Sequence, residues 1–206
     1  MALVVVVSCV LVGFFLLQLF PIHLLSGFSS SSISENQPEL NLAVIPETEP
    51  EVDSPVVIGL PVRLQIPSIA VNAAIEKVAL TADGAMDVPK DPMSAGWYVF
   101  GPRPGESGSA VIAGHLNWWH GAKGVFERLG AVKPGDLVIV EDDTGANSSF
   151  IVRESRKLDA KADTSEIFNP KDGKTHLNIV TCDGIWDNRA RQYTKRLVVF
   201  TDKVEE

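Results

Sequence analysis

The feature that most restricts the fold of this chain is a series of short apolar runs, which continues from about residue 56 to the end. Turn signals such as Asp83-Gly84 and Pro134-Gly135 separate the runs, and helical periodicity is confined to residues 124–129 and 162–168. The runs are Val62–Ile66, Val71–Val78, Ser109–Ala113, Leu137–Glu141, Phe150–Arg156, Leu177–Thr181 and Arg196–Thr201. About seven or eight short strands with so little helix predict an all-β fold, either a closed barrel or a sandwich.

The first part of the chain is an uncharged apolar segment. Residues 2–20 are interrupted only by Ser8, Gly13 and Gln18, and as a helix they would span about 28 Å, close to the ~30 Å hydrocarbon core of a bilayer. No Lys or Arg precedes Arg63 and no small-residue cleavage site follows the run, which favours an uncleaved signal-anchor over a cleaved signal peptide. The sequence therefore predicts a transmembrane helix within residues 1–25.

The composition changes abruptly in residues 26–55. A serine run, Ser29–Ser32, is followed by acidic residues interleaved with prolines, and no period typical of a strand or a helix is present. This pattern predicts a flexible acidic tether. Residues 56–206 are then left as the one folded domain.

Charge and cysteine content narrow the function. Lys and Arg total 18 against 26 Asp and Glu, a net charge of −8, so the chain repels phosphate backbones and nucleic acid is not an expected partner. Cys9 lies in the apolar segment and Cys182 in the polar part, so a disulfide between them is not expected. The folded domain has a single thiol, which is either a catalytic nucleophile or a buried small side chain.

Three residues that could take part in catalysis lie at the ends of predicted strands. Cys182 and His115 each follow an apolar run, and Gly114 before the histidine leaves space for a close approach. Arg196 opens the last run, and the loop 183–195 would return it to the same end of the barrel as Cys182. Each alone has an ordinary explanation, as a buried thiol, a structural histidine or an edge-strand arginine.

In this order, and with the Thr181-Cys182 pair, these residues resemble the sortase family of cysteine transpeptidases. Further motifs between residues 63 and 201 carry the resemblance, and their order and spacing are specific where each alone is weak. They are Arg63-Leu64-Gln65-Ile66-Pro67, Gly84-Ala85-Met86-Asp87-Val88-Pro89, Gly96-Trp97-Tyr98, Pro104-Gly105, Ala113-Gly114-His115, Val125-Phe126-Glu127-Arg128-Leu129 and Pro134-Gly135-Asp136. Taken together, these motifs are most similar to those of class F sortases. The family's T-L-x-T-C motif is kept only in part, because Asn178 and Ile179 stand where Thr and Leu are usual.

The resemblance implies an eight-stranded β-barrel with short helices, anchored by the N-terminal helix with the catalytic domain outside a bacterial membrane. Sortases cleave a C-terminal sorting signal of surface proteins, often LPxTG-like, between Thr and Gly. Cys182 would form a thioester that an amine of cell-wall precursor or a pilin Lys releases. His115 would transfer protons, and Arg196 would stabilise the oxyanion or position the peptide. No cofactor is implied.

Other residues near these three are candidates for substrate binding. Thr181 would hydrogen-bond the substrate or simply pack. Asn117 would orient the imidazole of His115 or serve as a turn residue. Trp186, in the connection between Cys182 and the last strand, would line the groove or pack beneath it.

The acidic run Glu141, Asp142 and Asp143 bears on metal binding, since some class A sortases use calcium. The same residues stand between two apolar runs and are followed by Thr144-Gly145, which is typical of a hairpin turn. We therefore expect a turn here and no metal.

Other classes of protein fit the sequence less well. A caspase-like peptidase also has His before Cys, but residues 116–181 lack the helical pattern that its crossover helices need. Papain-like enzymes have Cys before His, and L,D-transpeptidases would show a Ser/Thr-x-Gly-Cys turn that is absent. Two alternatives stay open: a predominantly hydrolytic cysteine peptidase, and an anchored, non-enzymatic β-barrel binding module in which Cys182 is merely buried.

Overall fold

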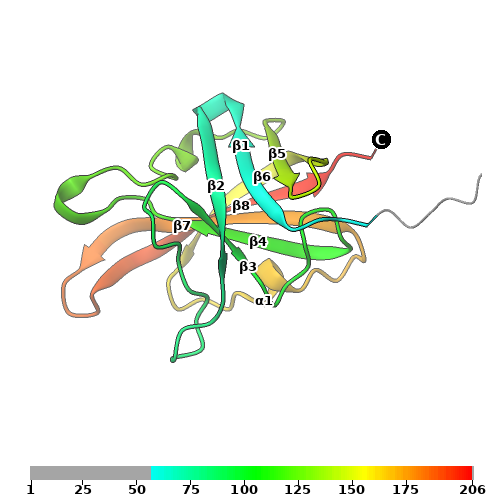
Figure 1. The fold of residues 1–206 in the computed structure, drawn as a ribbon. Helices are drawn as coiled ribbons and strands as arrows, with labels where there is room; N and C mark the ends of the chain where they lie inside the picture. Colours follow the sequence, from blue (N-terminus) through cyan, green and yellow to red (C-terminus); the bar gives the residue numbers. More distant parts are fainter. Residues whose placement is uncertain (1–56, 206) are drawn as a thin grey trace, which may run out of the picture. The chain divides into compact units, whose positions relative to one another are not determined.

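A computed structural model describes residues 57–205, which form a closed barrel of eight β-strands with little helix (Figure 1). The strands are β1 (Pro61–Ile66), β2 (Val71–Val78), β3 (Ala95–Tyr98), β4 (Gly108–Gly114), β5 (Leu137–Asp142), β6 (Asn147–Asp159), β7 (Thr175–Asp187) and β8 (Gln192–Lys203). Within the described residues the helices are one α-helical turn and three 3₁₀ turns, which are α1 (Ser165–Phe168), η1 (Pro67–Ile69), η2 (Trp119–Gly121) and η3 (Leu129–Ala131). The predicted all-β barrel with eight strands is confirmed.

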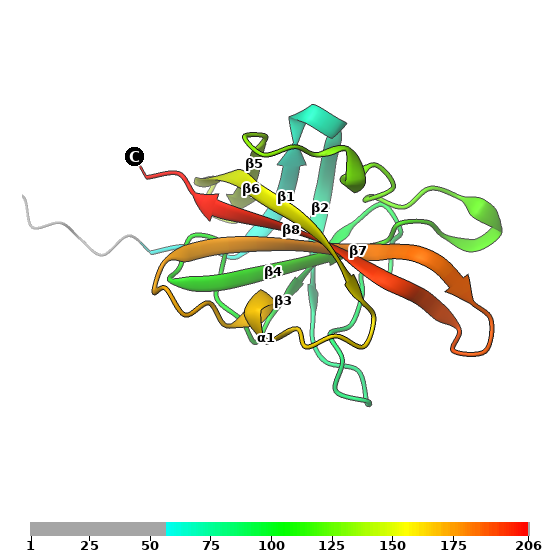
Figure 2. The same ribbon diagram turned by 180° about the vertical axis from the view of Figure 1, so that it is seen from behind.

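The strand order around the barrel is β1-β2-β3-β4-β7-β8-β6-β5, and β5 pairs with β1 to close it. Strands β2 and β3 are parallel neighbours, as are β4 and β7, and the other pairs are antiparallel. The C-terminal ends of β4 and β7 therefore lie at the same end of the barrel. Beyond that end, β7 and β8 continue as a two-stranded ribbon beside the connection that follows β4 (Figures 1 and 2).

The barrel interior holds the main hydrophobic core, to which strands contribute every second side chain. Leu177 and Ile179 of β7 are fully buried in it, and complete burial of a side chain of this size stabilises the fold by about 1.5–3 kcal/mol. A second, smaller apolar cluster contains Val111 of β4 and Val198 of β8. These residues alternate with members of the interior core, so the second cluster lies on the outer face of the barrel, beneath α1.

The predicted apolar runs all lie within strands, but two details of the prediction were wrong. Strand β3 was missed, because it has only four residues and includes Gly96, which leaves too short a pattern to recognise. Residues 125–128 form turns rather than a helix, with Val125 and Phe126 buried in the barrel core, and only Leu129 belongs to a helical turn, η3. The second patch, residues 162–168, does contain α1 at its end.

The ends of β7 and β8 also differ from the prediction. Cys182 was expected to end its strand and Arg196 to begin the next, with the loop 183–195 between them. Instead β7 runs to Asp187 and β8 begins at Gln192. The ribbon that these extra residues form has left the barrel and is largely exposed, so it lacks the one-sided apolar alternation by which strands are recognised.

The predicted membrane anchor at residues 1–25 and the predicted tether at residues 26–55 lie outside the described residues, so both stay predictions. Within residues 57–205, no helix has the length and apolar character to cross a membrane.

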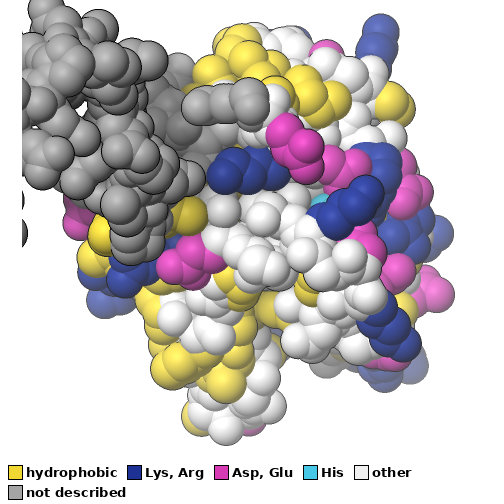
Figure 3. Space-filling view, turned by 90° about the vertical axis from the view of Figure 1, so that its right-hand side faces the viewer, with side chains coloured by type: hydrophobic (Ala, Val, Ile, Leu, Met, Phe, Trp, Pro, Cys, Tyr) yellow, Lys and Arg dark blue, Asp and Glu magenta, His cyan; other side chains and the backbone are white. Residues whose placement is uncertain are grey.

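Surface charges of opposite sign are interspersed on the face of the domain in Figure 3. Among the ion pairs are Arg153 with Asp202 (2.6 Å) and Lys123 with Glu127 (3.0 Å). Exposed pairs of this kind contribute at most about 1 kcal/mol each. The stability of the barrel therefore rests on its core rather than on its surface charges.

Candidate active site

Cys182 of β7 and Arg196 of β8 are direct partners across the antiparallel strand pair. Side chains alternate along each strand, so Cys182 lies on the same outward face as Val180, and Arg196 on the same face as Val198. Both side chains are half-buried and line one groove. The thiol and the guanidinium are thus neighbours at the point where the ribbon leaves the barrel.

His115 follows the last residue of β4, next to β7. The two strands pair in parallel register, with Ala113 beside Val180. Two residues further along both strands, the same register brings His115 level with Cys182. Strands β4, β7 and β8 are consecutive in the barrel, so Cys182 on β7, Arg196 on β8 and His115 directly after β4 lie at one end of it.

Thr181 holds these strands together just before the site. Its side chain is buried, and its hydroxyl donates to the carbonyl oxygen of Gly114 at 2.9 Å. This bond joins β7 to β4 one residue before Cys182 and His115. The structure thus places the hydroxyl of Thr181 in a contact between strands, which corresponds to the packing alternative.

The imidazole of His115 has a defined orientation. Its Nε2 atom lies 2.9 Å from the carbonyl oxygen of Pro89, and the ring of Trp118 packs edge-on with centroids 4.6 Å apart. A carbonyl oxygen only accepts hydrogen bonds, so Nε2 carries the proton and Nδ1 is the basic nitrogen of the neutral ring. The free nitrogen is therefore the one available for proton transfer.

The carbonyl that binds His115 is itself fixed by Glu76 of β2. The carboxylate of Glu76 accepts the backbone N–H groups of Lys90 (3.0 Å) and Asp91 (3.2 Å), directly after Pro89. The bond from Lys90 is the main cause that lowers the pKa of Glu76, so this carboxylate stays ionised. Glu76 thereby positions His115 through the backbone.

Two glycines allow the chain to pack closely around His115. A Cβ atom at Gly124 would lie 2.2 Å from the carbonyl oxygen of His115, and one at Gly114 would lie 2.5 Å from the ring of Phe126. The space expected at Gly114 is therefore taken by Phe126, whose N–H also bonds the His115 carbonyl at 2.9 Å.

A groove of about 870 Å³ crosses the outer face of the barrel and includes Cys182 and Arg196 in its lining. Val111, Ala113 and Val180 contribute to the lining from the barrel itself. The connection between β2 and β3 forms one wall, and residues 158–169, which include α1, form another. A groove with a mixed polar and apolar lining beside a thiol suits an extended peptide.

A profile of the sortase domain matches residues 64–204. The chain belongs to the sortase family. It is thus a cysteine transpeptidase, as the resemblance implied. A comparison with curated proteins gives no match.

Solved sortases of three classes share the fold. Sortase A from Corynebacterium diphtheriae, as a lid mutant, has a TM-score of 0.55 and 19% identity, with 71% of each chain covered. Sortase C-1 from Actinomyces oris has a TM-score of 0.54 and 21% identity, with 71% of this chain and 76% of that chain covered. A sortase D5 transpeptidase from Clostridium perfringens has a TM-score of 0.53 and 20% identity, with 71% and 79% covered. At these identities the likeness establishes the fold alone.

In this sortase two opposing effects act on the thiol. Burial raises the pKa of Cys182 above its ordinary value, and the positive charge of Arg196 opposes that rise. Burial is the larger effect, so the resting group at neutral pH is the thiol rather than the thiolate. Because the thiolate is the nucleophile, the sortase depends on a minor ionised fraction or on a base that removes the proton.

The guanidinium of Arg196 is held by contacts within its own strand, and some of its N–H donors remain unused. Nη1 donates to the carbonyl oxygens of Tyr193 and Lys195, each at 2.9 Å, and Nη2 makes only a long contact of 3.5 Å with Gln192. Within residues 57–205, Nε makes no hydrogen bond. Since arginine carries five N–H donors, this side chain can bind an oxygen in the groove without leaving its present contacts.

Asn117 and Trp186 both contact Tyr193, a residue that the sequence analysis did not single out. The amide of Asn117 donates to the hydroxyl of Tyr193 (2.5 Å), so it does not turn toward His115 here. The ring of Trp186 packs edge-on against that of Tyr193, at 5.4 Å. Trp186 is half exposed on the ribbon and is not part of the groove lining. No sequence signal marked Tyr193, because its contacts join segments far apart in the chain.

The acidic run Glu141, Asp142 and Asp143 ends β5 and begins the predicted turn to β6. The hydroxyl of Thr144 and three backbone N–H groups bond the carboxylate of Asp142, and together they lower its pKa, the hydroxyl most. Asp143 accepts the N–H of Leu60. These carboxylates are thus committed to the backbone, and within the described residues no group of three or more His, Cys, Asp or Glu is arranged to hold a metal.

Proposed function

We propose that this sortase cleaves an LPxTG-like C-terminal sorting signal between Thr and Gly and transfers the acyl group to an amine. The observation that carries the proposal is the direct cross-strand pairing of Cys182 with Arg196 in the lining of the groove. A peptide bound along the groove would present its carbonyl carbon to the thiol and its carbonyl oxygen to the guanidinium. This arrangement supports acyl transfer through a tetrahedral intermediate.

The first half of the reaction forms a thioester. Nδ1 of neutral His115 takes the proton of the Cys182 thiol, and the thiolate attacks the Thr carbonyl carbon. The oxygen that becomes negative is bound by the free N–H donors of Arg196. The C–N bond to Gly then breaks as the His115 imidazolium gives its Nδ1 proton to the departing nitrogen. The products are the acyl-enzyme, neutral His115 and a released peptide that begins with Gly.

The second half reverses these roles. An acceptor amine attacks the thioester carbon, and Nδ1 of His115 takes the proton that the nitrogen loses. The C–S bond breaks, which regenerates the Cys182 thiolate and leaves a new amide. The acceptor is an amine of cell-wall precursor or a pilin Lys, and the donors are surface proteins that carry the sorting signal.

The subclass and location form part of the same proposal. The motifs of the sequence support assignment to class F. Residues 1–25 would anchor the protein as a single-pass membrane protein, with the tether at residues 26–55 and the catalytic domain on the extracellular side.

Incubation of the full chain with a library of sorting-signal peptides and amine acceptors tests the proposal by mass spectrometry. We expect cleavage between Thr and Gly and a product that carries the added amine. Release of the free acid alone, even at high amine concentration, would instead show a hydrolytic peptidase. Absence of both cleavage and a covalent adduct on Cys182 would leave the non-enzymatic binding module.

A further inference from the structure

The outward face of β7 carries more than the nucleophile. Side chains that alternate with the barrel core on this strand are His176, Asn178, Val180 and Cys182. Asn178 precedes Cys182 by four residues, or about 13 Å along a strand. The strand that presents the thiol thus also runs under the wall of the groove that contains α1.

This wall has little structure of its own. Its only α-helical segment, α1, has four residues, too few to be stable without outside contacts. Ile167 of α1 is buried in the outer cluster, and Phe168 packs against the same cluster. The position of the wall therefore depends on what holds α1 to the barrel.

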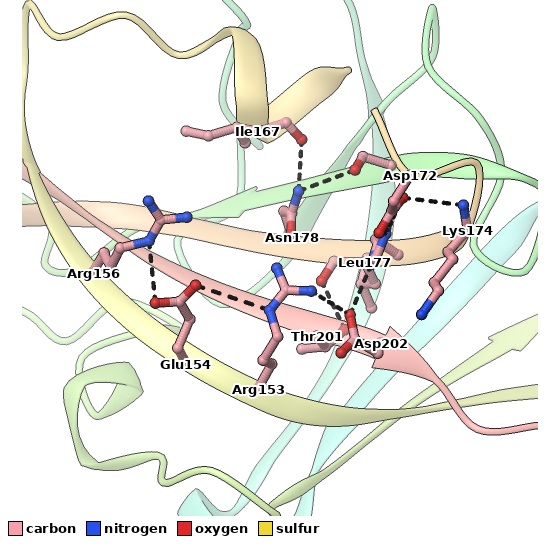
Figure 4. Close-up of polar contacts among 12 residues, drawn as sticks. Arg153, Glu154, Arg156, Ile167, Asp172, Lys174, Leu177, Asn178, Thr201 and Asp202 are labelled. Carbon is pink, nitrogen blue, oxygen red and sulfur yellow. Dashed lines mark hydrogen bonds and ion pairs between the residues drawn. The ribbon is translucent and has the colours of Figure 1, made fainter. Parts of the chain in front are cut away.

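Asn178 makes the most buried polar contact between α1 and the barrel. Its side chain is 2% exposed, and its Nδ2 donates to the carbonyl oxygen of Ile167 at 2.6 Å. The same nitrogen makes a longer contact of 3.3 Å with the hydroxyl of Ser109. In Figure 4 the amide of Asn178 points from β7 to the carbonyl of Ile167.

Asparagine can make this contact because its side chain is longer than that of threonine. In the T-L-x-T-C motif the residue here is Thr, whose hydroxyl is one bond nearer to the backbone than an asparagine amide nitrogen. The Oδ1 atom of Asn178 is buried without a hydrogen-bond partner in the described part of the chain, which is unfavourable. The hydrogen bond from Asn178 to Ile167, which the longer side chain allows, offsets this cost.

Two further contacts lie on or beside the wall, and each has at least one partner exposed to solvent. Arg156 pairs with Glu166 at 2.8 Å, and these side chains are 36% and 50% exposed. Buried His176 contacts the half-exposed Asp172 at 3.0 Å, in the connection between the wall and β7. Exposed pairs are screened by water, whereas the bond of Asn178 is shielded and fixes α1 at its centre.

We propose that Asn178 is a positioning residue that holds α1 as a wall of the groove, and so determines how tightly this sortase binds its sorting signal. The inference rests on the proposed function, because it concerns the peptide groove. When a binding site is ordered for only part of the time, the apparent dissociation constant rises in inverse proportion to that fraction. Asn178 therefore acts on peptide affinity and leaves the chemistry at Cys182 unchanged.

Asn178→Thr in the full chain is the decisive variant, since Thr is the residue usual in the family and favours a strand. We expect the KM for the peptide to rise about 3- to 10-fold, with kcat changed by less than about twofold. In the absence of peptide, hydrogen exchange in residues 160–174 should become at least about threefold faster. Exchange in β4 and β8 should not change.

Thr201→Val is the matched control. It removes another buried hydrogen bond, from the Thr201 hydroxyl to the carbonyl oxygen of Leu177 (2.7 Å), which joins two barrel strands and does not touch the wall. We expect a lower melting temperature, but no change in KM or in exchange of residues 160–174. Equal effects of the two variants on KM would overturn the role of Asn178.

The outcomes separate this inference from the function on which it rests. If the wild-type chain is active and Asn178→Thr leaves both KM and exchange unchanged, the inference alone fails. If no peptide is cleaved by the wild-type chain, the proposed function fails. Hydrogen exchange of residues 160–174 then still decides whether Asn178 holds the wall.

Discussion

Cys182 and Arg196 occupy opposite positions of one antiparallel strand pair, so the backbone itself sets their separation. A catalytic donor held in this way does not have to be ordered when the substrate binds, which saves conformational entropy in the transition state. The same pairing places a positive charge beside the thiol, where it opposes the effect of burial on the pKa of Cys182. One register relationship therefore suits both roles that we propose, Cys182 as the nucleophile and Arg196 as the donor to the oxyanion.

The first prediction concerns the nucleophile. Cys182→Ala should abolish both peptide cleavage and the mass of a covalent peptide adduct, because no other thiol is present in residues 57–205. The fold should persist, since the side chain is only half-buried. Cleavage assays and intact-protein mass spectrometry measure the two effects. Cys9→Ser is the control and should keep full activity, whereas near wild-type turnover by Cys182→Ala would rule out the cysteine mechanism.

A second prediction follows from the electrostatics of the thiol. Only the thiolate is alkylated, and burial raises the pKa of Cys182, so the iodoacetamide reaction should have its midpoint above that of an ordinary cysteine, about pH 8.5. Below the midpoint the rate should rise about tenfold per pH unit. Arg196→Gln removes the charge that opposes the shift, so it should move the midpoint higher still. The measurement uses the Cys9→Ser background, and a midpoint near or below about pH 8 would contradict it.

The sequence was sufficient for the parts of the site that depend on local pattern. Cys182 and His115 could be found because each follows an apolar run, and β4 and β7 do carry them to one end of the barrel. The strand boundaries near Arg196 could not be found, because the ribbon of β7 and β8 is exposed and has no apolar face. Tertiary position, rather than intrinsic preference, decides whether such residues form a strand.

Contacts to backbone carbonyls also could not be predicted from the sequence. Pro89 binds His115 and Ile167 binds Asn178 through main-chain oxygens that every residue has, so nothing in the residue types indicates them. The departure from the family motif at Asn178 was visible, but its partner was not. The role of Glu76 could not be predicted either, because its carboxylate bonds backbone N–H groups in the connection between β2 and β3.

A third prediction concerns the bond between Asn117 and Tyr193. It joins the connection that carries His115 to the ribbon that carries Arg196, so its loss should loosen both of these side chains together. Tyr193→Phe and Asn117→Ala should each lower kcat/KM about 3- to 10-fold. The double variant should be no worse than either single variant, because the same bond is lost in all three. Steady-state kinetics of this mutant cycle test it, and additive losses would show that the two residues act separately.

The last prediction distinguishes the arginines that follow Cys182. Arg196 is fixed opposite the thiol, whereas Arg189 and Arg191 lie in the turn between β7 and β8. Arg196→Ala should lower turnover about 10²- to 10³-fold, the usual effect of losing one oxyanion donor, and Arg196→Lys should recover little because an ammonium lacks the planar fork of donors. Arg189→Ala and Arg191→Ala are the matched controls, and each should change the rate by less than about tenfold, or ~1.4 kcal/mol of barrier. Steady-state kinetics of the four variants decide the assignment, since a severe loss in Arg191→Ala with a mild one in Arg196→Ala would place the oxyanion donor on the turn.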